Sequence, residues 1–201
     1  MTQSLESLLQ HPSLWRANGQ PNTRRFAVPS GYSALDARLP GGGWPFPSLV
    51  ELLIPEVGVG ELNLLIPMLR EMGQRTIALL NPPFIPYAPA LEEHRLDPTR
   101  VVVTTPLARL ETLWAMEQAL RSGACAAVLG WVEQAGMQTL RRLKLAANEG
   151  NCIGVLFRSI RCRTQPSPAH LRAVLGMDGG ELSIELIKVQ SGRSATVRMA
   201  L

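Results

Sequence analysis

The chain alternates between short apolar runs and segments in which apolar residues recur every three or four positions. The runs are rich in leucine, valine and isoleucine, as in strands that are buried on both faces. They fall at residues 49–54, 76–80, 101–104, 126–129 and 153–157. The amphipathic segments between them predict helices at residues 60–72, 88–94, 106–122 and 137–149. This order of elements predicts an α/β fold with a mainly parallel sheet flanked by helices.

The pattern changes towards the C-terminus. Residues 167–175 have the spacing of a short helix, whereas residues 181–190 alternate apolar and polar positions like a strand with one buried face. Ser191 and Gly192 predict a turn that leads into residues 195–201. These features predict a C-terminal antiparallel hairpin at the edge of the sheet.

The first residues carry a different pattern. Residues 4–15 have apolar positions near helical spacing and are followed by a polar stretch, which predicts a short helix on a tether. Residues 30–39 predict a capped helical turn, and the Pro- and Gly-rich residues 40–47 predict a loop. The expected organisation is an N-terminal helix and tether (1–28), a core (29–165) and a basic C-terminal segment with the hairpin (166–201).

The run at 49–54 leads into a turn with the glycine spacing of a phosphate-binding loop. Such loops hold phosphates with backbone N–H groups, a lysine and a Mg²⁺-binding hydroxyl. Here Glu61 and Leu62 take the places of Lys and Thr, and the only lysines, Lys144 and Lys188, lie far downstream. A carboxylate would repel phosphate, so we predict a vestigial loop that binds no cofactor. Its residues are Pro55, Glu56, Gly58, Gly60, Glu61 and Leu62.

No other catalytic or metal-binding pattern stands out. The cysteines are widely spaced without a Cys-x-x-Cys pair, and we expect free thiols. The histidines lack acidic or cysteine neighbours at ligand spacing, and we expect them at the surface. These residues are Cys125, Cys152, Cys162, His11, His94 and His170. The sequence therefore predicts no metal, no catalytic residue and no enzymatic activity.

The net charge of +4 comes from the C-terminal quarter of the chain. Residues 1–150 contain 13 basic and 13 acidic side chains, whereas residues 151–201 contain seven basic and three acidic. Arg158, Arg161 and Arg163 predict a loop that contacts the phosphates of DNA or an acidic protein surface. A basic loop that is simply solvated is the alternative.

Aromatic residues supply further candidate contacts. Trp44 and Phe46 lie on a proline-stiffened loop, where little entropy is lost on docking, although burial in the core would fit equally well. Trp131 follows a buried run at the carboxyl edge of the predicted sheet, where open α/β sheets bind ligands. The predicted partner-binding residues are Trp44, Phe46, Trp131, Arg158, Arg161 and Arg163.

No apolar stretch has the length that a membrane span needs, and the N-terminus lacks the basic start and apolar run of a secretion signal. We expect a cytoplasmic protein with no membrane partner.

Residues 30–62 resemble the approach to the ATP site of RecA-type recombinases. The resemblance rests on Ser30-Gly-Tyr-Ser-Ala-Leu-Asp36, on the glycine-rich turn at 41–43 and on Leu49-Val-Glu-Leu-Leu-Ile-Pro-Glu56. It implies a RecA-like core. The catalytic Glu and Asp of such ATPases would fall near Asn81 and near Gly130-Trp131, where this chain has no carboxylate. With the missing lysine of the phosphate loop, three positions needed for hydrolysis are empty.

A second resemblance covers residues 106–158. The segments that carry it are Ala119-Leu-Arg-Ser-Gly-Ala-Cys-Ala-Ala-Val-Leu-Gly-Trp131 and Ala146-Ala-Asn-Glu-Gly-Asn-Cys-Ile-Gly-Val-Leu-Phe-Arg158. They are similar to the paired signature of the SulA family of SOS-induced division inhibitors. This resemblance implies a RecA-like fold without nucleotide that caps the polymerisation surface of the tubulin-like division protein FtsZ.

The N-terminal part, with its Gly-Gly-Gly-Trp-Pro loop, resembles the sister family ImuA more closely, and that resemblance spans nearly the whole chain. Our main interpretation is therefore a non-catalytic SOS accessory and adaptor in translesion DNA synthesis. The partners that it implies are the polymerase-like ImuB, RecA and an error-prone DNA polymerase III α-type subunit. The alternative is a SulA-type division inhibitor that binds FtsZ. Weak DNA contact and homodimer formation stay open.

Overall fold

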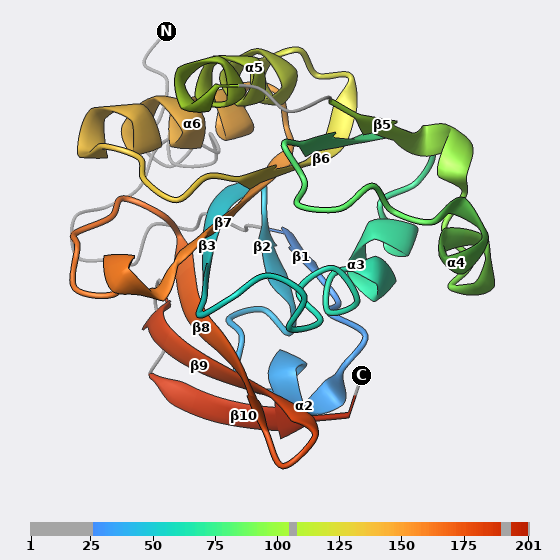
Figure 1. The fold of residues 1–201 in the computed structure, drawn as a ribbon, viewed down its shortest axis with the longest axis vertical. Helices are drawn as coiled ribbons and strands as arrows, with labels where there is room; N and C mark the ends of the chain where they lie inside the picture. The colour runs from blue at the N-terminus through green and yellow to red at the C-terminus, as the bar shows by residue number, and fades with distance from the viewer. Residues whose placement is uncertain (1–25, 105–107, 190–193, 201) are drawn as a thin grey trace, which may run out of the picture.

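The computed structural model describes residues 26–104, 108–189 and 194–200. Within these residues an eight-stranded sheet has the order β10-β9-β8-β3-β7-β6-β4-β5 (Figure 1). Its strands are β3 (Ser48–Ile54), β4 (Thr76–Leu80), β5 (Val101–Val103), β6 (Cys125–Trp131), β7 (Ile153–Ser159), β8 (Leu171–Asp178), β9 (Glu181–Val189) and β10 (Ala195–Met199).

The strands from β8 to β5 in this order are parallel, and β9 and β10 are antiparallel to their neighbours. Both the parallel sheet and the C-terminal hairpin at its edge are therefore confirmed. Because the carboxyl ends of the parallel strands meet at one edge of the sheet, the loops that follow β3, β4 and β6 converge there.

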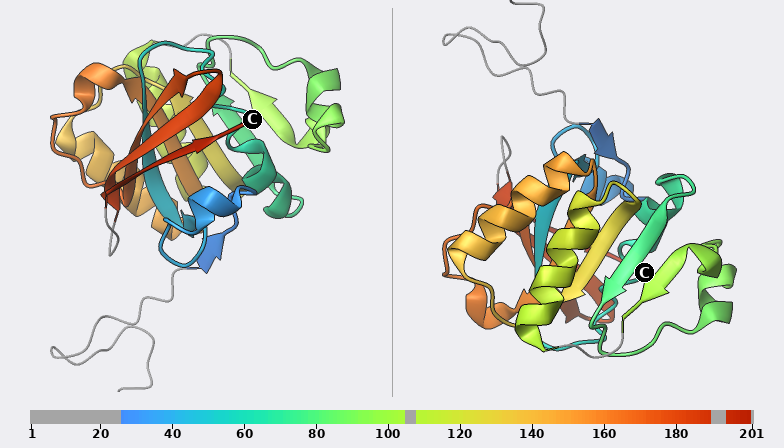
Figure 2. Two further views of the ribbon diagram at one scale, coloured as in Figure 1. Left: turned by 90° about the horizontal axis from the view of Figure 1, so that it is seen from below. Right: turned by 90° about the horizontal axis from the view of Figure 1, so that it is seen from above.

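Helices cover both faces of the sheet. The longer ones, α5 (Arg109–Arg121) and α6 (Met137–Glu149), lie side by side on one face (Figure 2). The opposite face packs against α2 (Ser33–Asp36) and α3 (Ile66–Glu71). The other helices of the described residues are α4 (Ala88–Glu93) and the 3-10 helices η1 (Pro98–Arg100) and η2 (Ile160–Cys162). Each face buries its own apolar cluster, as a three-layer α/β architecture requires.

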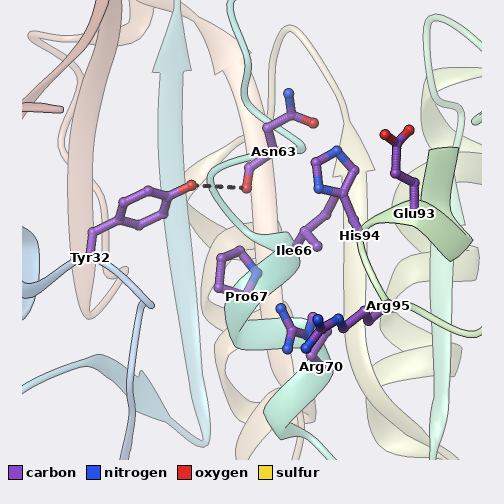
Figure 3. Close-up of a pocket in the computed structure, with 8 residues that line it drawn as sticks. All are labelled: Tyr32, Asn63, Ile66, Pro67, Arg70, Glu93, His94 and Arg95. Atoms are coloured by element: carbon purple, nitrogen blue, oxygen red, sulfur yellow. Dashed lines mark hydrogen bonds between the residues drawn. The ribbon is translucent and has the colours of Figure 1, made fainter. Parts of the chain in front are cut away.

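The helix predicted at residues 60–72 is shorter than expected, because α3 begins at Ile66. Proline has no N–H, so Pro67 cannot donate to the carbonyl of Asn63 four residues earlier. The Tyr32 hydroxyl donates to that carbonyl instead, at 3.5 Å (Figure 3). A proline in the first turn therefore delays the regular helix.

The short helix predicted at residues 167–175 is wrong. This segment contributes β8, which pairs with β3 on one side and β9 on the other. Residues 171–175 are all buried, so both faces of the strand are covered and its apolar positions do not alternate. Strand β8 lies in the segment expected to follow the core at residue 166, and it pairs with β3 as part of the parallel sheet.

The loop predicted at residues 40–47 contains a strand. In the part of the chain that the structure describes, β2 (Trp44–Phe46) pairs with β1 (Phe26–Val28) in a separate two-stranded sheet. Trp44 is fully buried, which corrects its prediction as a partner-binding residue. Phe46 is half-buried and lies opposite the exposed Phe26. The helix predicted at residues 4–15 and His11 lie outside the described residues.

Among the described residues, no helix combines the length and the apolarity that a membrane crossing needs.

Candidate functional site

Three loops meet at the carboxyl edge of the parallel sheet. They follow β3, β4 and β6, and they line two adjoining hollows of about 260 and 380 Å³. Pro82, Pro83 and Trp131 line both hollows. The indole of Trp131 stacks on Phe157 with ring centroids 4.5 Å apart. The edge is thus a broad, partly aromatic surface rather than a closed cleft.

The predicted vestigial phosphate loop borders this surface. Glu61 is 5% exposed, and both of its carboxylate oxygens lie within hydrogen-bond distance of the Gly58 backbone N–H, at 3.2 and 3.1 Å. A carboxylate of the chain itself therefore takes a backbone donor that a phosphate would use in a functional loop. Pro55, Glu56 and Gly58 are exposed beside it.

The positions after β4 and at the end of β6 also lack a carboxylate. Asn81 has a left-handed φ of 54°. Its N–H donates to the Thr104 hydroxyl at 3.1 Å, and its side-chain amide donates to the Trp131 carbonyl at 3.5 Å. Asn81 therefore ties the loop after β4 to neighbouring elements. None of the residues lining the two hollows is a histidine, cysteine or lysine. The acidic residues that line them are Glu56, Glu61 and Glu133.

Large apolar side chains stand exposed at the hollows or in the same loop as a residue that lines them. Val57, Phe84, Ile85 and Tyr87, which we call the apolar rim, are 46%, 70%, 83% and 73% exposed. Three of them come from the loop Asn81-Pro-Pro-Phe-Ile-Pro-Tyr87, whose prolines stiffen it. Sequence reasoning missed this rim. The run of apolar and aromatic residues between prolines was the available signal, because such residues gather in a loop when a surface binds a partner.

Arg158 is not part of an exposed loop, which corrects its prediction as a partner-binding residue. Its side chain is 1% exposed and donates to the carboxylate of Glu51 on β3 at 3.2 Å. Arg172 on β8 donates to the other oxygen of Glu51 at 2.7 Å, and the Ser167 hydroxyl also donates to Glu51, at 2.9 Å. Burial of these charges is tolerated because each is paired and hydrogen-bonded.

The other two arginines of the predicted loop are exposed but differ in their surroundings. Arg163 forms a bidentate ion pair with Glu185 on β9, with N–O distances of 2.7 and 2.5 Å. That contact raises the pKa of Arg163 and lowers the pKa of Glu185. Within the described residues the Arg161 side chain makes no ion pair. The structure therefore does not gather the three arginines into one basic patch.

His170 is buried rather than at the surface. Its Nδ1 accepts the Leu49 backbone N–H at 3.0 Å, so it helps to join β3 to the segment before β8. His94 is exposed, as predicted. All three cysteines are free and buried. Burial raises the pKa of Cys152 to about 12, which keeps this thiol protonated and unreactive.

Comparison with known proteins decides the family. The family model described as "Cell division inhibitor SulA" matches residues 53–154, from within β3 to the start of β7. The chain belongs to the SulA family. The matched stretch contains the loop with Glu61, the loop that carries most of the apolar rim, and helices α5 and α6.

Individual SulA proteins show the same relation. The "Cell division inhibitor SulA" of Yersinia enterocolitica is 31% identical over 112 residues, which cover 55% of this chain and 67% of the relative. The protein of the same name from Salmonella arizonae is 34% identical over 110 residues, covering 53% and 65%. The chain thus spans about two thirds of the length of these relatives. The crystal structure of SulA from Pseudomonas aeruginosa is 25% identical, with a TM-score of 0.45 over 55% of this chain and 97% of the other.

The family model and the two SulA relatives confirm the resemblance to SulA, and the model covers residues 119–131 and most of residues 146–158. They support the division-inhibitor alternative better than our main interpretation, because the relatives and the family model named above are division inhibitors. The ImuA assignment, and with it translesion synthesis and the partners ImuB, RecA and the polymerase III α-type subunit, receives no support from them. The RecA-like character of the core stays a prediction.

Proposed function

We propose that this protein is a SulA-type inhibitor of cell division that binds FtsZ and blocks its polymerisation. The observation that carries the proposal is the match of residues 53–154 to the SulA family model. The inhibitor acts by occupying a surface of its partner, and it performs no chemistry of its own.

The loop after β3 supports a non-catalytic mechanism. A nucleotide would have to displace the buried carboxylate of Glu61 from the Gly58 N–H and would then face its negative charge. The one cation that lines the neighbouring hollows, Arg158, is already paired with Glu51. We therefore propose that the fold keeps the loop as a structural turn, and that function resides in the surface around it.

We assign the contact with FtsZ to the apolar rim and the hollows that it surrounds. Burial of exposed aromatic side chains on a stiff loop supplies binding free energy at low entropic cost. Phe84 and Tyr87 are the strongest candidates for anchors, since aromatic residues dominate the energetics of many interfaces. Trp131, which lines both hollows, provides a partly buried aromatic floor.

The test combines FtsZ sedimentation with substitutions in the apolar rim. The wild-type protein should reduce the polymer that FtsZ forms with GTP, and Phe84→Ser with Tyr87→Ser should weaken inhibition about tenfold or more. Leu145→Ser is the matched control, because Leu145 is an exposed apolar residue (58%) in the C-terminal half of α6, which runs from the carboxyl edge of the sheet towards the start of β7.

Two results would contradict the proposal. In the first, FtsZ polymerises normally at saturating wild-type protein. In the second, ImuB or RecA from the same cell is retained by the immobilised protein and FtsZ is not, which would restore the translesion interpretation. If the double variant still inhibits FtsZ polymerisation, the protein is a division inhibitor but the apolar rim is not its contact surface.

A further inference from the structure

A separate cavity of about 280 Å³ lies between the residue that precedes α2, helix α3 and the end of α4. Figure 3 shows its lining side chains. They are Tyr32, Asn63, Ile66, Pro67, Arg70, Glu93, His94 and Arg95. One part of the wall is apolar or aromatic, and the other part is basic.

The basic part contains two arginines without a partner. Arg70 and Arg95 are both exposed, and among the described residues neither guanidinium forms an ion pair or a hydrogen bond. The Arg95 side chain extends toward Arg70, whereas the carboxylate of Glu93 points away from both (Figure 3). Two positive charges at one cavity, with Glu93 as the one lining acid and paired with neither, favour an anionic ligand.

The backbone of Arg95 makes this arrangement unusual. Helix α4 ends in a Schellman motif, in which the Arg95 N–H donates to the Glu92 carbonyl and the Leu96 N–H donates to the Leu91 carbonyl, both at 2.8 Å. The motif places Arg95 at φ 59°, where glycine is favoured and a long side chain is disfavoured. An arginine at a position that suits glycine carries a backbone cost, which is a reason to look for a use of its side chain.

Helix α6 ends in the same motif and provides an internal comparison. The Asn151 N–H donates to the Asn148 carbonyl at 3.3 Å, and the Cys152 N–H donates to the Ala147 carbonyl at 2.9 Å. Asn151 has φ 48°. Asparagine tolerates this conformation well, so the end of α6 needs no functional explanation. Of these two helix ends, the end of α4 is the one that places a cation at a cavity.

We propose that this cavity binds an acidic peptide segment of a partner protein. One carboxylate pairs with Arg70 and another with Arg95, each of which offers a planar fork of donors that matches a carboxylate. An apolar side chain of the peptide lies against Ile66, Pro67 and Tyr32.

The lining favours carboxylates over phosphate. Phosphate sites draw on several backbone N–H groups, often in a glycine-rich turn. None of the lining residues is a glycine, and Pro67 has no N–H. Glu93 also borders the cavity, where it would oppose a compact dianion more than an extended peptide whose charges are spread out.

The first experiment measures peptide binding by fluorescence polarisation. The probe is a labelled peptide of alternating glutamate and leucine, and its counterpart has glutamine in place of glutamate. The acidic peptide should bind about tenfold or more tightly than the glutamine peptide. Its affinity should fall as salt is added, because the paired charges are exposed. Inorganic phosphate should compete only weakly.

The second experiment uses Arg95→Gly, which removes the cation and suits the backbone. This variant should keep or raise the melting temperature while weakening peptide binding about tenfold, and Arg70→Gln should weaken it similarly. The matched control is Asn151→Gly, which makes the corresponding change at the end of α6. It should leave peptide binding unchanged.

The proposal is overturned if the wild-type protein binds both peptides equally or binds neither. It is also overturned if Arg95→Gly binds like the wild type, or if Asn151→Gly weakens binding as much. Phosphate that binds more tightly than the peptide would identify a small-anion site instead. Since these measurements use the purified protein alone, their failure leaves the proposed inhibition of FtsZ untouched, and the reverse also holds.

Discussion

Gly150, the C-cap residue of α6, packs tightly against the end of α5. A Cβ atom at this position would lie 1.8 Å from the Leu120 carbonyl oxygen at the end of α5. The neighbouring Glu149 pairs with Arg121 of α5 at 2.7 Å, and Asn151 ends the helix in the left-handed conformation. The string Ala146-Ala-Asn-Glu-Gly-Asn151, which carries the resemblance to SulA, is therefore explained by helix packing and capping.

Gly150→Ala should destabilise the protein by about 3 kcal/mol, because the added methyl group overlaps backbone that cannot move without separating the two helices. Urea denaturation followed by circular dichroism measures the change. Gly176→Ala on β8 is the control, since a Cβ there meets nothing within 4 Å, and its effect should stay within about 0.5 kcal/mol. Equal stability of the two variants would show that α5 and α6 do not approach as described.

The buried thiol of Cys152 makes the free energy of unfolding depend on pH in the alkaline range. Burial raises its pKa from 9.0 to about 12 in the folded protein. Because the folded pKa is raised, the contribution of this thiol is fully present below pH 9.0 and is lost between pH 9.0 and about 12. The difference in unfolding free energy between the wild type and Cys152→Ala should fall by about 1.4 kcal/mol per pH unit in that window. A constant difference would contradict a protonated thiol.

Individual side chains are where sequence reasoning was least successful. Arg158 and His170 were expected at the surface, and both are buried. Their partners, Glu51 and Leu49, lie more than 100 positions away in the sequence, so no local pattern distinguishes a paired buried arginine from a solvated one. Glu61, by contrast, could be identified because its position in the glycine turn was informative by itself.

At the scale of elements, Glu51 joins three strands and a loop. It pairs with Arg158 on β7 and Arg172 on β8. Arg172 in turn donates to the carbonyls of Cys162, Arg163 and Gln165, at 2.9, 3.3 and 3.0 Å. The segment between β7 and β8 is thus held on the sheet by a charge that originates on β3.

Glu51→Gln should cost about 3–5 kcal/mol of unfolding free energy, because two buried guanidinium groups lose their counter-charge. The same variant should expose the segment between β7 and β8 to limited proteolysis. Glu56→Gln, at an exposed position nearby, should change stability by no more than about 0.5 kcal/mol. If Glu51→Gln has the same urea midpoint as the wild type, the ion pairs of Glu51 with Arg158 and Arg172 contribute no net stability.

Elements with a clear period were predictable and the others were not. Helix α6 has the predicted bounds, residues 137–149, because its apolar residues recur on one face. The strand β8 was predicted as a helix, because a short run buried on both faces has no period that separates strand from helix. Strand β2 was missed because Pro45 lies within it, and proline normally argues against a strand.

At the scale of the whole molecule, the hydrophobic periodicity predicted the layers of helices and sheet. It did not predict the order of the strands, because the pattern identifies strands without showing which of them pair. The SulA family could be recognised from the sequence at the end of α6, residues 146–151. The cavity with Arg70 and Arg95 depends on segments that only the folded chain brings together, so it was not predicted. Most of the apolar rim lies in one loop, and its signal in the sequence was missed.

The combined variant Glu61→Lys with Leu62→Thr should hydrolyse neither ATP nor GTP. It restores two residues of a phosphate-binding loop, but the ends of β4 and β6 still present Asn81 and Trp131 where a carboxylate is needed. Release of inorganic phosphate measures the activity. Turnover above that of the wild type would refute the view that the loop is structural.

Strand β3 pairs only with β7 and β8 in the main sheet. Both partners follow it by about a hundred residues, so a growing chain on the ribosome has no neighbour for its central strand until most of the protein has been made. During that interval the apolar segment Ser48–Ile54, which is buried along its whole length in the finished protein, remains without its sheet neighbours. A fragment that stops at residue 150 would keep this strand unpaired, and aggregation is the expected fate of such a truncated product.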